Sequence, residues 1–210
     1  MLYAITDRRL YGDTEDIRTQ RLLELTAEWG ANGVAFIQLR EKDLSARNQF
    51  ELARAMLAIL RNTRTRLLIN GRPDVALASG ADGVHLPAGP DALPPNEIRA
   101  IFAQRSESVP DISVSCHTLA EVARACEQKP DVILFAPVFE KVLAGKAGST
   151  LPGAGLDRLE EVCRAATPIS VFALGGVTTQ NASQCLQAGA AGIAAIRLML
   201  EPASAWRNLA

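Results

Sequence analysis

The fold is decided by Val34-Ala35-Phe36-Ile37-Gln38-Leu39-Arg40-Glu41-Lys42, in which a strand-like apolar run passes directly into charged residues. A run that is apolar without alternation predicts a strand buried on both faces, as in parallel sheets. Side chains alternate along an extended chain, so Gln38, Arg40 and Lys42 are expected on one side of it. An amide and two cations there form an anion site suited to phosphate or pyrophosphate. The alternative is a solvated strand end whose charges, Glu41 included, form a surface salt bridge.

Similar apolar runs recur along the chain and alternate with longer amphipathic segments. In the first such segment, Leu22, Leu25 and Trp29 share one face at helical spacing. Strands that alternate with helices predict βα units, and about eight units in 210 residues fit an α/β fold of the (β/α)₈ TIM-barrel type, with residues 1–210 as a single domain. A doubly wound open sheet is the alternative. Strands are predicted at Leu2–Thr6, Val34–Leu39, Arg66–Asn70, Gly83–Leu86, Ile112–Ser115, Val132–Ala136, Ile169–Ala173 and Ile193–Ile196, and helices near Arg18–Trp29, Ala46–Arg61, Pro73–Ser79, Pro95–Gln104, Leu119–Glu127, Leu156–Ala165 and Asn181–Ala188.

Composition excludes several classes of function. The net charge of -1 and the 21% of charged residues give no broad surface for nucleic acid or membrane. The four cysteines are scattered without a CxxC pair, which argues against structural zinc and fits a reducing, cytoplasmic setting. The first residues lack the pattern of a signal peptide, and no apolar run reaches membrane-spanning length. The sequence leaves a homo-oligomer open.

In a barrel, functional residues lie at the carboxyl ends of the strands. Gly175-Gly176 closes one predicted strand, and glycine lets backbone N–H groups approach an anion; the alternative is a tight turn. Arg197 follows the last predicted strand. Its guanidinium is expected to bind the same anion as the two glycines, and the alternatives are that it caps a helix or pairs with Glu201. The other strand ends carry Asn70, His85, Ser115 and His117.

The two histidines receive different interpretations. His117 lies close behind a predicted strand, and imidazole suits a general acid or base at neutral pH. His85 lies inside a predicted strand, and we expect it to pack in the core. Thr118 is predicted to cap the next helix, with Glu121 as its capping-box partner. The polar, glycine-rich residues 140–155 are expected to lack regular structure, as a mobile lid or as an ordinary loop.

Taken together, these motifs resemble the thiamin phosphate synthase family and its relatives, the thiazole tautomerases. The resemblance covers nearly the whole chain, and the joint order and spacing of the motifs make it specific. The family fold is the TIM barrel predicted above. The motifs are Tyr3-Ala4-Ile5-Thr6-Asp7, Gln38-Leu39-Arg40-Glu41-Lys42, Ala81-Asp82-Gly83-Val84-His85-Leu86, Ser113-Val114-Ser115-Cys116-His117-Thr118, Ala136-Pro137-Val138-Phe139 and Gly175-Gly176-Val177.

The resemblance implies substrates and residue roles. The synthase joins an aminopyrimidine methyl pyrophosphate to a thiazole phosphate and releases pyrophosphate. By resemblance, the pyrophosphate is held by Gln38, Arg40 and Lys42 with Asn70 nearby, and Ser115 donates a hydrogen bond to it. Gly176, next to Gly175, and the backbone around Ile196 hold the thiazole phosphate. Catalysis would come chiefly from stabilising the departing pyrophosphate, to which Lys42 and Ser115 contribute.

The chain departs from the synthase pattern at the metal site. The synthases hold Mg²⁺ with two aspartates, and the corresponding positions here are Gly71 and Pro90. Asp91 is one residue away and would serve only after a shift of register. The Thr-x-Thr-Lys pattern is replaced by Lys141-Val142-Leu143-Ala144, and Arg197 stands where a phosphate-binding serine is usual. The resemblance thus implies Mg²⁺ for a synthase, while both expected ligands are absent.

Three functions therefore remain open. The first is the synthase, a transferase. The second is a thiazole tautomerase, which moves a proton on a thiazole carboxylate phosphate without metal or other cofactor; Asn70-Gly71-Arg72 resembles that version, and His117 matches the histidine assigned there to proton transfer. Because synthases also carry a histidine at this position, His117 does not discriminate between the two. The third is a non-catalytic regulatory protein that binds thiazole phosphate or thiamin phosphate.

Overall fold

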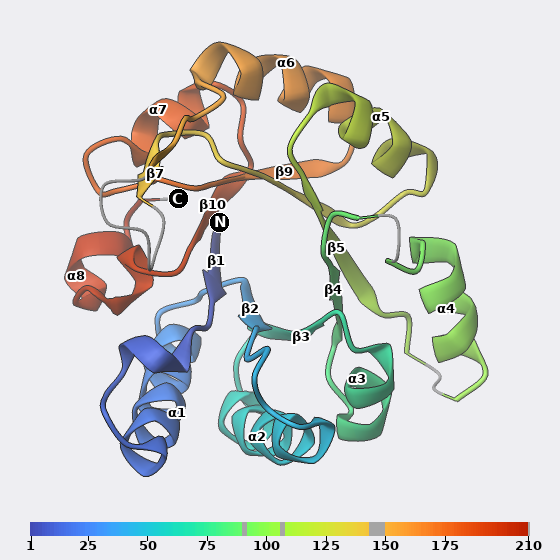
Figure 1. Cartoon of the computed structure of the whole chain (residues 1–210), viewed down its shortest axis with the longest axis vertical. Helices are drawn as coiled ribbons and strands as arrows, with labels where there is room; N and C mark the ends of the chain where they lie inside the picture. Colours follow the sequence, from blue (N-terminus) through green and yellow to red (C-terminus); the bar gives the residue numbers. More distant parts are fainter. Residues whose placement is uncertain (90–91, 106–107, 143–149, 210) are drawn as a thin grey trace.

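The computed structural model describes residues 1–89, 92–105, 108–142 and 150–209. Eight parallel strands close into a barrel, and the helices surround it (Figure 1). The last strand, β10, pairs with the first, so the (β/α)₈ prediction is confirmed and the open sheet is wrong. The barrel strands are β1 (Leu2–Ile5), β2 (Phe36–Leu39), β3 (Arg66–Asn70), β4 (Gly83–Leu86), β5 (Asp111–Cys116), β6 (Val132–Phe135), β9 (Ser170–Leu174) and β10 (Gly192–Ala195).

The helices agree with the sequence predictions except at some ends. The first helix begins at Glu15, three residues before its predicted start at Arg18, because the Thr14 side chain caps it by accepting from the N–H of Ile17. The structure also has a short helix near the C-terminus that the sequence pattern does not predict. The helices are α1 (Glu15–Ala31), α2 (Ala46–Leu60), α3 (Pro73–Ser79), α4 (Pro95–Ala103), α5 (Leu119–Glu127), α6 (Leu156–Ala166), α7 (Ala182–Gln187) and α8 (Ala203–Trp206), with 3₁₀ turns η1 (Arg8–Leu10) and η2 (Leu198–Leu200).

The sequence predicts no regular structure for residues 140–155, between β6 and β9. The structure has two short strands there. Lys141–Val142, which is β7, pairs antiparallel with Thr150–Leu151, which is β8. Two-residue strands carry no alternating apolar pattern, so the sequence gives no signal for them. Positions 143–149, with Gly145, Lys146 and Gly148 of the expected loop, lie outside the described residues.

The core consists of an inner and an outer layer. Inside the barrel, the rings of Tyr3, Phe36 and Phe172 contact one another with centroid separations of 5.5 to 6.1 Å. Between barrel and helices, Trp29 is fully buried, and its indole N–H donates to the Met199 carbonyl at 3.1 Å. Both strand faces are therefore covered, which explains the continuous apolar runs. Within the described residues, no helix is long and apolar enough to cross a membrane.

Ion pairs tie together the amino-terminal ends of three strands. Arg66 on β3 contacts Asp82, which precedes β4, at 3.0 Å and Asp111 on β5 at 2.9 Å. Residues at this end of a TIM barrel serve stability, whereas function lies at the opposite end. The candidate site is therefore sought where the strands end.

Candidate active site

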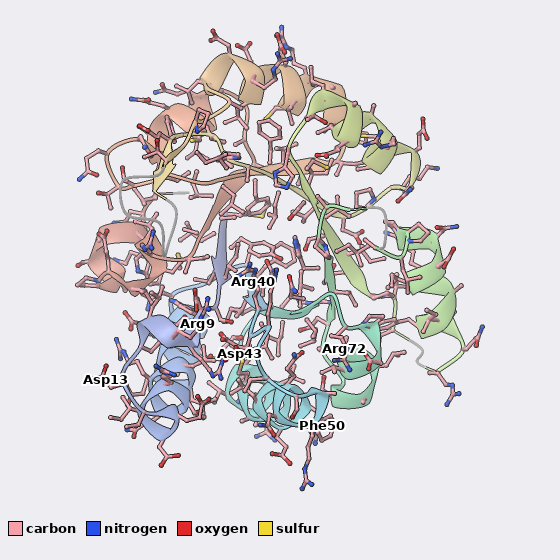
Figure 2. All side chains as sticks on the ribbon, in the orientation of Figure 1. Arg9, Asp13, Arg40, Asp43, Phe50 and Arg72 are labelled. Atoms are coloured by element: carbon pink, nitrogen blue, oxygen red, sulfur yellow. The ribbon has the colours of Figure 1, made fainter. Side chains whose placement is uncertain are left out.

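Two cations lie together at the carboxyl end of β2. The backbone N–H of Arg40 donates to the Thr6 hydroxyl at 2.9 Å, which fixes the chain as it leaves the strand. The nearby guanidinium of Arg40 lowers the pKa of Lys42. Both cations also contribute to the lowered pKa of His85 inside the barrel, so their charges act on the barrel mouth. Figure 2 shows Arg40 nearer the middle of the barrel than Arg9 or Arg72.

Glu41 lies between these cations in sequence but points away from them, and the alternative of a surface salt bridge is wrong. Its side chain is 1% exposed, and it accepts from the Arg8 backbone N–H at 3.0 Å and from the Arg8 guanidinium Nη1 at 3.1 Å. Arg8 is 4% exposed and also pairs with Glu15 and Asp43. This buried network anchors the segment that carries Arg40 and Lys42. In the described part of the chain, neither of those two cations has a carboxylate within ion-pair distance.

Gln38 and Asn70 form an amide pair across neighbouring strands. Gln38 Nε2 donates to Asn70 Oδ1 at 2.8 Å, and Gln38 Oε1 is buried without a partner in the described residues. A buried acceptor without a donor is costly, so a ligand must donate to it or the amide must turn. If both side-chain amides flip by 180°, Asn70 donates to Gln38 and the hydrogen bond between them is kept. Gln38 then presents its NH₂ group where its unpartnered oxygen had been. The pair is thus able to serve an amino group or a phosphate oxygen.

A polar chain crosses the barrel interior beneath the mouth. Ser113 Oγ lies 2.9 Å from the Tyr3 hydroxyl and 2.8 Å from His85 Nδ1, and His85 Nε2 lies 3.0 Å from Ser115 Oγ. Burial, with the charges of Arg40 and Lys42, lowers the pKa of His85 to about 3, so the ring is neutral. His85 is buried as predicted, but both of its nitrogens are hydrogen-bonded, and its role as simple packing is corrected.

His117 lies beyond the end of β5 with an exposed side chain. Its Nδ1 is 2.6 Å from the Ala136 carbonyl oxygen. Because a carbonyl only accepts, Nδ1 carries a proton, and in the neutral ring the free lone pair is therefore on Nε2. The predicted capping box of Thr118 and Glu121 is present, and Glu121 also accepts from the His117 backbone N–H. The imidazole is therefore held in the tautomer that a general base requires.

The two glycines after β9 pack against the chain that follows β6. Gly175 has φ +94° and Gly176 φ +67°, and a Cβ on Gly176 would lie 2.6 Å from the Glu140 carbonyl oxygen. Asn181 closes the turn by donating to the Gly176 carbonyl at 3.0 Å, a contact that no pattern in the sequence indicates. The tight turn is thus present. Within the described residues the N–H groups of Gly175, Gly176 and Ile196 have no hydrogen-bond partner, so an anion remains able to bind there.

Arg197 is exposed and precedes the 3₁₀ turn η2, where it occupies the N-cap position without a side-chain cap bond. Among the described residues it forms no ion pair with Glu201. A TIM barrel often binds phosphate between the loops after its seventh and eighth strands and a short extra helix. Arg197 and η2 occupy that position here.

Replacing Gly176 with alanine is expected to destabilise the protein by about 2–4 kcal/mol, because left-handed strain adds to overlap with Glu140 and Phe139. Gly80→Ala is the matched control, since Gly80 has φ +76° but no neighbour within 4 Å of its Cβ position. It should lose only about 1 kcal/mol. Urea unfolding of both variants measures the difference, and equal losses would show that the close approach is unimportant.

The described residues do not supply a magnesium site. Gly71, at the position of the first expected aspartate, has φ +64° and no side chain, and Asn70 Oδ1 already accepts from Gln38. No cluster of three or more histidine, cysteine or acidic side chains occurs in the part of the chain that the structure describes. Pro90 and Asp91 lie outside the described residues. The magnesium site that the resemblance implies therefore does not fit the described residues.

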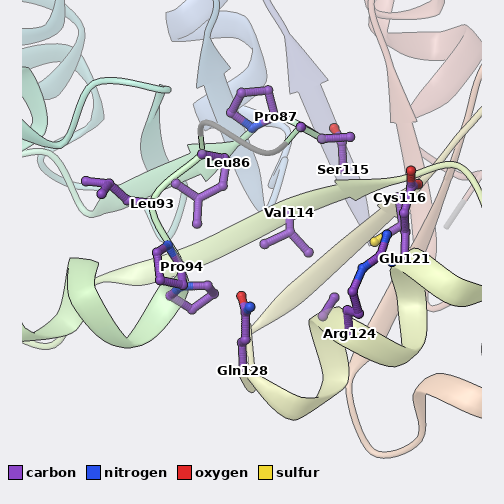
Figure 3. Close-up of a pocket in the computed structure, with 15 residues that line it drawn as sticks. Leu86, Pro87, Leu93, Pro94, Val114, Ser115, Cys116, Glu121, Arg124 and Gln128 are labelled. Atoms are coloured by element: carbon purple, nitrogen blue, oxygen red, sulfur yellow. The ribbon is translucent and has the colours of Figure 1, made fainter.

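A cavity of about 450 Å³ lies beside the barrel mouth, between α4 and α5 (Figure 3). Its lining includes Leu86, Val114 and Ser115 from the strand ends and Arg124 and Gln128 from α5. Arg40, Lys42 and Asn70 do not line it. The residues predicted to bind phosphate converge on the barrel mouth instead, and we take the mouth as the candidate site.

Comparison with known proteins agrees with this geometry. The profile of the family described as thiamine monophosphate synthase matches residues 2–199. The chain belongs to the thiamine monophosphate synthase family. A protein of Geobacter sulfurreducens named putative thiamine-phosphate synthase is 41% identical over 199 residues, covering 95% of this chain and 86% of the relative. A thiamine-phosphate synthase of Roseiflexus sp. (strain RS-1) is 32% identical over 212 residues, covering 100% and 83%.

A solved structure of this family has the same architecture. Thiamine phosphate pyrophosphorylase from Pyrococcus furiosus superposes with a TM-score of 0.74 at 29% identity, over 93% of this chain and 84% of that chain. The resemblance that the sequence motifs indicate is therefore confirmed, and with it the barrel. The roles of individual site residues in this family member stay predictions.

Proposed function

We propose that the protein is a thiamin phosphate synthase, a transferase that couples hydroxymethylpyrimidine pyrophosphate with thiazole phosphate and releases pyrophosphate. The observation that carries the proposal is the pair of neighbouring cations, Arg40 and Lys42, which form no ion pair within the described residues, at the mouth of a barrel of this family. A pyrophosphate supplies the negative charge that the two cations lack. The proposal leaves open whether the enzyme works as a homo-oligomer.

The two halves of the barrel mouth suit the two substrates. On β2 to β5 the inward side chains near the mouth are polar: Gln38, Asn70, His85 and Ser115. On β9 and beyond β10, Leu174 and Ile196 extend the apolar inner cluster. A pyrophosphate would bind on the polar side, and the thiazole ring would pack on the apolar side. Its phosphate would bind the free N–H groups of Gly176 and Ile196 beside Arg197.

Catalysis would follow from electrostatic stabilisation of the leaving group. As the carbon–oxygen bond of the pyrimidine pyrophosphate breaks, negative charge grows on the departing pyrophosphate and a cation develops on the pyrimidine. Arg40, Lys42 and the Ser115 hydroxyl would stabilise that growing charge, and the thiazole nitrogen would capture the cation. Fixed donors of this kind each typically contribute about 10²- to 10³-fold in rate.

The proposal is tested by incubating the purified protein with both substrates and measuring thiamin phosphate and pyrophosphate. We expect the two products in equal amounts. Formation of neither product would sink the proposal, and calorimetric binding of thiamin phosphate without turnover would assign the regulatory role instead.

Chelation of Mg²⁺ with EDTA is expected to slow coupling by less than about tenfold, because the two positions at which the synthases carry their magnesium-binding aspartates are Gly71 and Pro90 here. Loss of a resident ion that stabilises the leaving group would cost several kcal/mol, or more than about a hundredfold. Initial rates with and without chelator distinguish these cases. A strict Mg²⁺ requirement, together with a higher Mg²⁺ concentration needed for half-maximal activity in Asp91→Asn, would place the metal at that residue, contrary to the expectation.

A tautomerase activity is the second candidate, and the protonated Nδ1 of His117 favours it because Nε2 is free to accept a proton. His117→Ala is then expected to slow aromatisation of the thiazole carboxylate phosphate by about 10²- to 10⁴-fold. Absorbance of the aromatic product follows the reaction. If wild-type protein aromatises this substrate and does not couple, the synthase proposal is wrong.

A further inference from the structure

Two serines on β5, Ser113 and Ser115, face the barrel interior. The proposed function gives a role to Ser115 but none to Ser113. Ser113 and Ser115 are two residues apart and therefore point to the same face of the strand. Ser113 is fully buried, and Ser115 is partly exposed at the mouth. His85 on the neighbouring strand bridges them, and Tyr3 on β1 reaches Ser113 from across the barrel. The result is one chain of contacts: Tyr3–Ser113–His85–Ser115.

The hydrogens of this chain have one consistent arrangement. Tyr3, Ser113, neutral His85 and Ser115 each carry one polar hydrogen, and three contacts join them. One hydrogen must therefore point out of the chain. Tyr3 and Ser113 are fully buried, and no other described group accepts from their hydroxyls. An unpaired polar hydrogen in the core is costly. The hydrogen that forms no bond within the chain of contacts is therefore the hydroxyl hydrogen of Ser115, at the open end.

The direction of every bond follows. The Tyr3 hydroxyl donates to Ser113, Ser113 donates to His85 Nδ1, and the Nε2–H of His85 donates to Ser115 Oγ. The reverse order would leave the phenol hydrogen of Tyr3 without an acceptor. With its oxygen already accepting from His85, Ser115 turns its own hydrogen toward the barrel mouth. The cations Arg40 and Lys42 act on the same space, so an anion there meets the Ser115 hydroxyl as a donor.

We propose that Tyr3, Ser113 and His85 are positioning residues that make Ser115 a committed hydrogen-bond donor to the anionic leaving group. The inference deepens the proposed function and rests on it for the identity of the anion. His85 neither touches the substrate nor exchanges a proton. It acts through Ser115, whose hydroxyl is oriented before the substrate arrives, so that no reorganisation is needed during reaction.

The tautomer of His85 tests the direction of the chain without any ligand. Long-range ¹H–¹⁵N NMR spectra of the ¹⁵N-labelled protein distinguish protonated from unprotonated ring nitrogens. The chain has two histidines, and the His117→Gln variant leaves His85 alone for assignment. We expect the proton on Nε2. A proton on Nδ1 would overturn the inference, whether or not the protein is a synthase.

A double-mutant cycle tests whether His85 acts through Ser115. The readout is the affinity for inorganic pyrophosphate by calorimetry, with kcat and KM of coupling measured separately. His85→Leu and Ser115→Ala are each expected to weaken binding by about ten- to a hundredfold. The double variant should bind no more weakly than Ser115→Ala alone, within about twofold. Losses that multiply would show that His85 acts independently, and would overturn the inference.

Two further variants separate positioning from stability. Glutamine at position 85 is able to place an N–H donor near Ser115, so His85→Gln should restore most of the affinity that His85→Leu loses. Thr26→Val removes a buried hydroxyl that bonds Leu22 far from the mouth, and should lower stability without changing pyrophosphate affinity. If wild-type protein binds no pyrophosphate, the proposed function fails, while the NMR result still decides the direction of the chain.

Discussion

Replacing Arg40 with alanine is expected to lower kcat/KM for coupling by about 10²- to 10³-fold, which corresponds to roughly 3–4 kcal/mol of transition-state stabilisation. Arg40 and Lys42 are the cations at the barrel mouth, and in the described residues neither forms an ion pair; the Asp7 carboxylate, which feels the charge of Arg40, is paired with Arg9. Because positions 71 and 90 lack the two expected aspartates, no metal bound by them shares in stabilising the departing pyrophosphate. Steady-state kinetics with both substrates measure the change.

Two variants make the Arg40 result specific. Arg40→Lys keeps the charge but loses the planar fork of donors, so we expect an intermediate loss. Arg47→Ala removes the same charge from α2, where Arg47 is 85% exposed and pairs with Glu51, and should leave kcat/KM unchanged. A loss below about threefold in Arg40→Ala would show that the leaving group is not stabilised by this cation.

Replacing Arg8 with methionine is expected to destabilise the fold by about 3–5 kcal/mol, because it leaves the buried Glu41 carboxylate without its partner. Burial already raises the pKa of Glu41, and loss of Arg8 should raise it further. A carboxyl whose folded pKa lies above its unfolded value is favoured when protonated, so the deficit should shrink as the pH falls from 7 toward 5. Urea unfolding at both pH values measures it.

Two further variants test whether the lost stability comes from the buried Glu41 charge. Arg8→Met combined with Glu41→Leu removes both buried charges and should regain most of the lost stability. Arg9→Met breaks the exposed pair with Asp7 and should change stability little. A deficit in Arg8→Met that grows toward acid pH would contradict the assignment to Glu41.

Much of the candidate site could be predicted from the chain because a TIM barrel places function at the strand ends. The runs before Gln38, Asn70, Ser115 and Gly175 are apolar without alternation, so each strand and its end could be located. The family motifs then gave those ends expected roles. The orientation of the Glu41 side chain and the hydrogen-bond partners of His85 could not be predicted, since both depend on residues far away in sequence.

The sequence by itself determined the number of βα units, the carboxyl ends of the barrel strands to within one residue and the membership of the thiamine monophosphate synthase family. These follow from local patterns of burial and from motif order. Only the tertiary structure decided that Arg8 turns Glu41 inward and that Tyr3 meets Ser113, 110 residues later. When a barrel closes, inward side chains from any two strands become neighbours, whatever their separation along the chain. The direction of a hydrogen bond depends on what is buried at each end, and burial exists only in the folded protein.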